Sequence, residues 1–376
     1  MNIKKLLALL LAVVMVFGLV ACGNETANNE SNNMADTTEH DHDHDHDHEE
    51  ETPASLTIEH AMGTTEVPYA PERVCVLDSN AMDFMMALEL TEYVTCVQSP
   101  KGMPSYLEEF YNSEAIIRLE RAESDDRDET AETTDPYESY YSIDADLIIG
   151  SADAVDADLY AVLSQIAPTI VTGYAIDHED GMYAGVKANA RMIASIWGQE
   201  AKLDAVMEEY DALYQQLGEA VNGVTCVMMN STLDSNRIQV VSNDGWNKDK
   251  EKLEAERSCR ILFDLGMIMY SNDAPEEVVA ASGYERNIEP AAQISKNQVI
   301  ADWIAEVNPA YILVVDRNYT SIEEAEADGY GYAELAGLSQ YQEGKMFMLS
   351  YDGRIGASGL YGLMIQMNEL ADIFLN

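Results

Sequence analysis

Short apolar runs alternate with amphipathic stretches over the first half of the chain. Apolar runs of four residues predict buried strands, and apolar residues spaced by three and four predict helices. The predicted strands are 74–77, 94–97, 147–150 and 169–172, and the predicted helices between them are 80–90 and 156–166. The order is therefore strand, helix, strand, which is typical of a sheet covered by helices. The acidic, tyrosine-rich stretch 120–141 has no period and predicts a surface loop.

A long amphipathic stretch at 200–221 separates this block from a second one. Its apolar residues, which share one helical face, are Leu203, Val206, Met207, Tyr210, Leu213, Leu217 and Val221. Such a helix is about 33 Å long at 1.5 Å per residue, enough to cross from one lobe to another. An ordinary surface helix has the same periodicity, so the pattern alone leaves both interpretations open.

The second block repeats the alternation. Its predicted strands are 225–229, 238–242, 311–315 and 345–349, and its predicted helices are one ending at 265–266, one capped by Ser295 and running to 307, and one at 360–374. We therefore expect an α/β fold with two β/α lobes joined by a single long helix. The predicted division is an N-terminal lobe at 55–180, a linking segment at 181–221 and a C-terminal lobe at 222–376.

The chain begins with a short apolar segment, 6–21, that follows Lys4 and Lys5. This pattern is typical of an export signal and is too short to span a membrane comfortably. Its end, "LVACG", resembles the lipobox of bacterial lipoproteins, which implies a signal peptide at 1–22 and a lipid anchor on Cys22. An ordinary signal peptide with a chance cysteine is the alternative. We expect a monomer held at the outer face of the cell membrane.

Residues 23–54 are almost entirely polar and predict a disordered tether. The tether contains "HDHDHDHDH", whose imidazoles are His40, His42, His44, His46 and His48. A flexible chain can fold several imidazoles around Zn²⁺, Ni²⁺ or Cu²⁺, but closing it costs conformational entropy. We therefore expect weak divalent-metal binding here, and we keep capture of free metal as an alternative function.

Charge and motifs exclude several functions. The formal net charge of −47 repels nucleic acid. The sequence has no nucleophile elbow, zinc-protease motif or P-loop, and only His60 and His178 lie outside the tether, so we expect neither an enzyme nor a resident cofactor. The cysteines at 75, 96 and 226 lie in apolar runs and are expected to be buried, and a disulfide between Cys75 and Cys96 stays open.

Four segments carry a family likeness. They are "VPYAPERVCVLDSNAMDFMMALEL", "DADLIIGSADAVDADLYAVLSQIAPTIV", "NPAYILVVDRN" and "FMLSYDGRIGASGL". In their order and spacing they resemble the substrate-binding proteins of iron-siderophore ABC importers, a class III family with a helical backbone. The resemblance implies a ligand cleft between two lobes, capture of a ferric siderophore and delivery to a permease. Corrinoid- and haem-binding proteins share this fold, so these ligands remain alternatives.

The resemblance also implies site residues. By position, Arg257, Arg317, Tyr351 and Arg354 resemble pocket residues, since arginine and tyrosine suit an anionic, aromatic chelate. Trp246 lies on a predicted turn and is a candidate cleft-wall aromatic. Each has a structural alternative, such as an ion pair on a helix face or a loop anchor.

One departure concerns the ligand. Catecholate-binding relatives carry an arginine soon after a strand where this chain has "IIGSADAVDAD", with Ala152 and Asp153. The departure weighs against a highly charged tris-catecholate and leaves hydroxamate or mixed siderophores, less charged chelates and corrinoids. For the permease, the resemblance implies exposed acids on each lobe, for which the candidates are Glu108, Glu109, Glu276 and Glu277.

Overall fold

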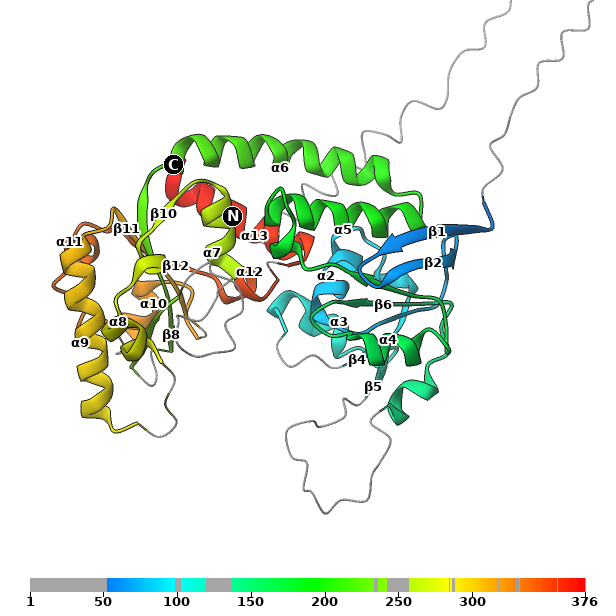
Figure 1. Cartoon of the computed structure of the whole chain (residues 1–376), viewed down its shortest axis with the longest axis horizontal. Coiled ribbons are helices and arrows are strands. Elements are labelled where there is room, and N and C mark those ends of the chain that lie inside the picture. Colours follow the sequence, from blue (N-terminus) through cyan, green and yellow to red (C-terminus); the bar gives the residue numbers. More distant parts are fainter. Residues whose placement is uncertain are drawn as a thin grey trace, which may run out of the picture. The chain divides into compact units, whose positions relative to one another are not determined.

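Two separate five-stranded sheets organise the chain (Figure 1). A computed structural model describes residues 53–98, 103–119, 137–232, 236–241, 257–283, 285, 288–316, 318–328, 330, 332–356 and 358–375, with the backbone alone at 257–259 and 354–356. The predicted α/β class with two β/α lobes is confirmed. The exact lobe boundaries and the ligand cleft stay predictions.

The N-terminal sheet is entirely parallel, in the order β5-β4-β3-β6-β7. Its strands are β3 (Val74–Val76), β4 (Val94–Gln98), β5 (Ile117–Leu119), β6 (Leu147–Ser151) and β7 (Thr169–Thr172). Its helices are α2 (Ser79–Ala87), α3 (Glu108–Tyr111) and α4 (Ala157–Leu163), with 3-10 turns η1 (Thr91–Tyr93), η2 (Ser105–Leu107), η3 (Glu138–Ser142) and η4 (Ala175–Asp177). All residues of β3, β6 and β7 are buried, as expected when helices cover both faces of a parallel sheet.

A hairpin that the pattern did not predict precedes this sheet. Its antiparallel strands are β1 (Ser55–His60) and β2 (Gly63–Pro68). Only Ile58 and Val67 are buried in it, so the segment lacks the apolar run by which the other strands were found. The Ala61 N–H donates to the Val171 carbonyl at 3.0 Å and so fastens the hairpin to β7.

The C-terminal sheet has the order β10-β8-β11-β12, and β9 pairs antiparallel with β8. Its strands are β8 (Thr225–Thr232), β9 (Arg237–Val240), β10 (Ile268–Met269), β11 (Tyr311–Asp316) and β12 (Met346–Leu349). Its helices are α7 (Arg257–Asp264), α8 (Glu276–Ser282), α9 (Pro290–Val307), α10 (Ile322–Ala327), α11 (Ser339–Gln342) and α12 (Tyr351–Gly356), with the 3-10 turn η6 (Tyr270–Asp273). Val227, Ile312 and Trp303 belong to one buried cluster between this sheet and its helices.

Three long helices, α5 (Met182–Ile196), α6 (Glu200–Val221) and α13 (Leu360–Phe374), pack against one another. α6 has the predicted bounds, and five of its seven predicted apolar residues are buried. The C-terminal helix α13 follows the second sheet in sequence but contacts α2 of the first block, as well as α5 and α6 (Figure 1). α13 therefore connects the two blocks by packing, in addition to the covalent connection through α6.

Three predicted helix ends were wrong, one of them the end of the helix predicted at 156–166, which stops at Leu163. Ser295 does not cap a helix, because α9 begins at Pro290 and the Ser295 hydroxyl donates back to the Ala291 carbonyl at 2.9 Å. Proline at the first position of a helix loses no intrahelical hydrogen bond, and this was the stronger start signal. The helix predicted at 80–90 ends at Ala87, since Glu89 has a φ of 58°.

Cys75 and Cys96 are cross-strand partners in β3 and β4, and both are buried as free thiols, as is Cys226. Their predicted burial is confirmed, whereas the disulfide left open by the sequence is absent from this structure. No helix within the described ranges is long and apolar enough to cross a membrane. The export signal and the tether lie outside those ranges.

Candidate functional site

The carboxyl ends of parallel strands are where open α/β sheets bind ligands, because loops and helix N-termini converge there. In the N-terminal sheet, this edge is organised by Asp78, which follows β3. Its Oδ1 accepts the N–H groups of Asn80 at 2.9 Å and Ala81 at 3.0 Å, and its Oδ2 accepts the Ser151 N–H at 2.7 Å. The carboxylate thus caps α2 and joins the ends of β3 and β6, while burial raises its pKa.

The segment after β6 completes this edge with a second carboxylate and a tyrosine. Asn80 Nδ2 donates to Asp153 at 2.9 Å, and the Tyr174 hydroxyl donates to the Ala152 carbonyl at 2.7 Å. Tyr174 is 48% exposed, so its ring also offers a surface to an aromatic ligand. The five residues that follow each of β3, β6 and β7 include no lysine or arginine. The segments that follow these three strands are therefore acidic and aromatic, whereas Lys101 follows β4 in the sequence.

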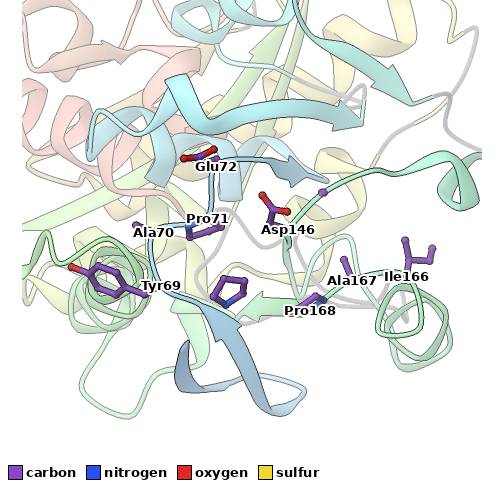
Figure 2. Close-up of a pocket in the computed structure, with 10 residues that line it drawn as sticks. Tyr69, Ala70, Pro71, Glu72, Asp146, Ile166, Ala167 and Pro168 are labelled. Atoms are coloured by element: carbon purple, nitrogen blue, oxygen red, sulfur yellow. The ribbon is translucent and has the colours of Figure 1, made fainter. Parts of the chain in front are cut away.

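A surface pocket of about 450 Å³ lies at the opposite edge of the same sheet. It is lined by residues just before β3, β6 and β7, among them Glu72, Asp146 and Pro168 (Figure 2). Arg73 beside it pairs with Asp146 at 2.7 Å and with Asp144 at 2.6 Å. Because the pocket is at the amino ends of the strands, it is not where ligands of such sheets bind.

In the C-terminal sheet, the corresponding edge is built around Asp316, the last residue of β11, which is fully buried. The Ser231 hydroxyl donates to its Oδ2 at 2.6 Å, and the Asn318 N–H donates to its Oδ1 at 2.8 Å. The Tyr332 hydroxyl lies 2.8 Å from Ser231 Oγ, and burial raises the pKa of Tyr332. These bonds fix the chain on both sides of position 317.

A second turn at this edge follows β12 and leads into α12. The Ser350 N–H lies 3.2 Å from Oε2 of Glu369 in α13, and Ser350 Oγ accepts the Gly353 N–H at 3.1 Å. Burial raises the pKa of Glu369. Tyr351 is the first residue of α12, is half-buried and directly follows this hydrogen-bonded turn.

No family model matches the chain, but individual proteins do. The petrobactin-binding protein YclQ of Bacillus subtilis (strain 168) is 25% identical over 327 residues, which cover 86% of this chain and 83% of YclQ. The ferric-anguibactin-binding protein FatB of Vibrio anguillarum (strain ATCC 68554 / 775) is 21% identical and covers 85% of this chain and 87% of FatB.

Solved structures give the same result. The siderophore-binding protein BauB, bound to a complex of two acinetobactin molecules and ferric iron, matches with a TM-score of 0.60 at 19% identity, over 85% of this chain and 98% of BauB. VctP from Vibrio cholerae, a periplasmic catecholate-siderophore-binding protein, matches with a TM-score of 0.58 at 19% identity, over 85% of this chain and 99% of VctP. The fold is that of the siderophore-binding proteins. The resemblance drawn from the four sequence segments is confirmed.

All five predicted ligand residues belong to the C-terminal block. Three of them follow β11 or β12 closely in the sequence. Arg317 directly follows Asp316 but lies outside the described residues. Arg257 begins α7 and Arg354 lies in α12, and the structure gives only their backbone. Tyr351 is the one predicted ligand residue with a described side chain. Trp246, the five tether histidines and Cys22 lie outside the described ranges.

The four predicted permease contacts are exposed on two helices of this siderophore-binding-protein fold. Glu108 and Glu109 are in the first turn of α3, and Glu276 and Glu277 are in the first turn of α8. Acidic side chains at these positions are favoured by the helix dipole, so they also have a structural reason to be there.

The two body histidines have separate surroundings. His60 Nε2 lies 2.9 Å from Thr65 Oγ1, its ring meets Tyr160 edge-on, and burial lowers its pKa. His178 Nδ1 accepts the Asp180 N–H at 3.2 Å. In the part of the chain that the structure describes, no three His, Cys, Asp or Glu side chains are grouped as metal ligands would be.

Sequence reasoning missed the residues that build the two edges, namely Asp78, Ser231, Asp316, Ser350 and Glu369. Asp78 carried a signal, because aspartate between an apolar run and a helical stretch is a common N-cap. Asp316 and Ser350 also follow predicted strands directly. Ser231 and Glu369 carried none, since their partners are distant in sequence.

Proposed function

We propose that this protein is a lipid-anchored, extracellular binding protein that captures a ferric siderophore and delivers it to the permease of an ABC importer. The observation that carries the proposal is the fold, which this chain shares over most of its length with the siderophore-binding proteins BauB and VctP. The similarity to YclQ and FatB supports it independently through sequence. Cys22 is the proposed anchor, and the working form is a monomer.

The proposed ligand contacts are divided unequally between the two sheets. Arg317, Arg257 and Arg354 supply positive charge from the C-terminal side, and Tyr351 supplies an aromatic ring there. A guanidinium pairs with carboxylate or catecholate oxygens through two parallel hydrogen bonds. On the N-terminal side, the segments after β6 and β7 offer the Asp153 carboxylate and the exposed Tyr174 ring.

This division favours a chelate of modest negative charge over a tris-catecholate. Three catecholates around Fe³⁺ carry a charge of −3, and the carboxylates of Asp78 and Asp153 would repel that charge. A hydroxamate or mixed siderophore carries less charge and places less electrostatic cost on this edge. We therefore propose a mixed or hydroxamate ligand, with the aromatic groups of a mixed ligand against tyrosine.

The test is a titration of the full chain with a panel of probes, followed by quenching of tyrosine and tryptophan fluorescence. The panel comprises ferric petrobactin, ferric anguibactin, ferric acinetobactin, a ferric tris-catecholate, a ferric trihydroxamate, a corrinoid, haem and Zn²⁺. We expect submicromolar, saturable quenching by one of the less charged ferric chelates. Saturation only by the corrinoid, haem or Zn²⁺ would contradict the proposal.

Delivery to a permease requires a docking surface, for which we propose Glu108 and Glu109 on α3 and Glu276 and Glu277 on α8. The corresponding test replaces each pair by glutamine. It measures how far the loaded protein stimulates ATP hydrolysis by the complete importer. Chelate affinity should be unchanged in both variants, whereas stimulation should fall. A loss of affinity would instead place these residues at the ligand.

A further inference from the structure

The 3-10 turn η2 of the first block contacts the α12 turn of the second block. The Ser105 N–H donates to Asp352 Oδ1 at 2.7 Å, and the Ser105 hydroxyl donates to the other oxygen of the same carboxylate. Asp352 is the second residue of α12 and directly follows Tyr351. A two-donor contact of this kind fixes the direction of the carboxylate as well as its distance.

Tyr106, the next residue of η2, makes a second contact that is more deeply buried. Its hydroxyl donates to Asp83 Oδ2 at 2.5 Å, and its ring packs on Tyr361 with the centroids 4.7 Å apart. Asp83 lies on α2 and is fully buried. Tyr106 is thereby held by a carboxylate on one side and by an aromatic ring on the other.

Asp83 connects this contact to the C-terminal helix. It accepts the N–H groups of Tyr361 at 2.6 Å and Gly362 at 3.0 Å, which are two of the unpaired donors in the first turn of α13. Gly359 permits the approach, because a Cβ there would overlap the Asp83 carboxylate. A side chain from the first block therefore caps a helix from the end of the chain, where a cap from the same helix is more usual.

From these contacts we propose that Ser105, Tyr106, Asp83 and Asp352 form a clamp whose task is to position Tyr351 and Arg354 for the chelate. The clamp rests on the proposed function, since it assigns to these four residues the placement of that function's ligand contacts. They are positioning residues, because they act on the ligand through α12. The segment 350–353 is then held from two sides, by Glu369 at Ser350 and by Ser105 at Asp352.

The two halves of the clamp differ in exposure, which makes one of them testable without unfolding the protein. Asp83 is buried and caps a long helix, so its replacement affects stability broadly. Asp352 is only partly buried, and its bonds go to one exposed residue. Removing the Asp352 charge should therefore loosen the α12 turn with little loss of global stability.

The experiment compares the wild-type full chain with Asp352→Asn, Ser105→Ala and a control, Asp156→Asn. Asp156 also accepts a backbone N–H, that of Leu159 at 2.8 Å, but it only caps α4 within the first block. Hydrogen exchange in the absence of ligand is measured for peptides covering 103–107 and 350–356. Affinity for the chelate that binds best in the panel is then measured for each variant.

We expect Asp352→Asn to raise exchange in both peptides at least fivefold and to weaken chelate binding about tenfold, since it removes the charge from the carboxylate that both Ser105 donors contact. Ser105→Ala keeps the hydrogen bond from the backbone N–H to Asp352. It should therefore raise exchange and weaken binding less than Asp352→Asn does. Asp156→Asn should change neither quantity. Unchanged exchange, or unchanged affinity with raised exchange, in Asp352→Asn would overturn the clamp. If the wild-type protein binds no probe, the proposed function fails by itself, and the exchange comparison still decides whether the clamp orders the segment.

Discussion

The ends of β3 and β6 in the N-terminal sheet and the end of β11 in the C-terminal sheet carry different charged residues. After β3 and β6 of the N-terminal sheet stand Asp78 and Asp153, whereas after β11 of the C-terminal sheet Arg317 directly follows the buried Asp316. On the first edge, Asp78 is engaged by three backbone N–H groups and Asp153 by the Asn80 amide. On the second, the Asp316 carboxylate is engaged by the Ser231 hydroxyl and the Asn318 N–H.

This difference shows that charged residues near a strand end have two distinct uses. Carboxylates accept backbone N–H groups, so they are suited to capping helices and joining loops, and the first block uses them in that way. Guanidinium groups have no acceptor and are suited to anionic ligands. The carboxylates after β3 and β6 therefore serve the scaffold, and the proposed binding of the chelate's charge rests on the arginines of the C-terminal block.

The largest expected effect concerns Asp83, a fully buried carboxylate of the scaffold. Burial raises its pKa to about 7, from 3.8 in the unfolded chain, despite hydrogen bonds from Tyr106, Tyr361 and Gly362 that lower it. The folded protein thus binds this proton more tightly, so the contribution to stability is complete below pH 4 and is lost as the pH rises through 7.

Over that range, the loss is on the order of 4 kcal/mol, at 1.36 kcal/mol per unit of pKa shift. Asp83→Asn cannot titrate, so the difference in unfolding free energy between wild type and variant should shift in the variant's favour as the pH rises from 4 to 7. Urea unfolding at several pH values measures it, and other buried acids cancel in the difference. A constant difference would show that Asp83 is ionised throughout and that its helix-capping bonds outweigh its burial.

The next largest effect is expected at Arg317, which tests the basic edge. Arg317→Glu should weaken chelate binding about 100-fold, since it removes a charge-assisted hydrogen bond and adds repulsion of the anionic ligand. Arg317→Lys keeps the positive charge but not the two parallel donors of the guanidinium, so its affinity for the chelate should fall less than that of Arg317→Glu. Isothermal titration with the best-binding chelate provides the measurement. Equal affinity in the Glu variant would mean that the chelate's charge is met elsewhere.

A smaller effect is expected at Tyr351, which tests whether the aromatic part of the ligand also binds on the C-terminal side. Tyr351→Ala should weaken binding about tenfold through loss of an aromatic contact, and Tyr351→Phe should weaken it by less than threefold. Tyr174→Ala is the matched change on the N-terminal edge. If Tyr174→Ala costs more than Tyr351→Ala, the acidic edge takes part in recognition and the comparison between the two edges is weakened.

The sequence predicted the repeating elements well because burial enforces periodicity. β7, α6 and α13 have the predicted bounds, and each carries a regular apolar pattern. The β1–β2 hairpin was missed because it buries only two apolar side chains and is held by pairing with its own partner strand. Apolar patterns do not record such pairing.

The candidate site was predictable only in part, for a different reason. Arg317 and Tyr351 were found through a resemblance over four segments, which fixes positions in a chain but not their surroundings. The clamp was not found, since Ser105 and Asp352 are 247 residues apart and each has an ordinary local interpretation. Contacts of that kind depend on how two sheets and three helices are arranged, which no local pattern contains.

The smallest expected effect concerns the tether and separates it from both edges. Deleting residues 40–48 should change chelate affinity by less than twofold, because the proposed ligand contacts lie outside the repeat and a chelate that supplies all six donors to Fe³⁺ leaves no coordination site for imidazole. The same deletion should abolish most Zn²⁺ binding by the full chain, since the repeat holds five of the seven histidines and the described part of the body has no metal-ligand group. Replacing the five histidines by serine keeps the tether length and serves as the control for it. A large loss of chelate affinity in the serine variant would move iron recognition from the folded edges to the repeat, and the contrast between an acidic scaffold and a basic binding edge would then have no bearing on the ligand.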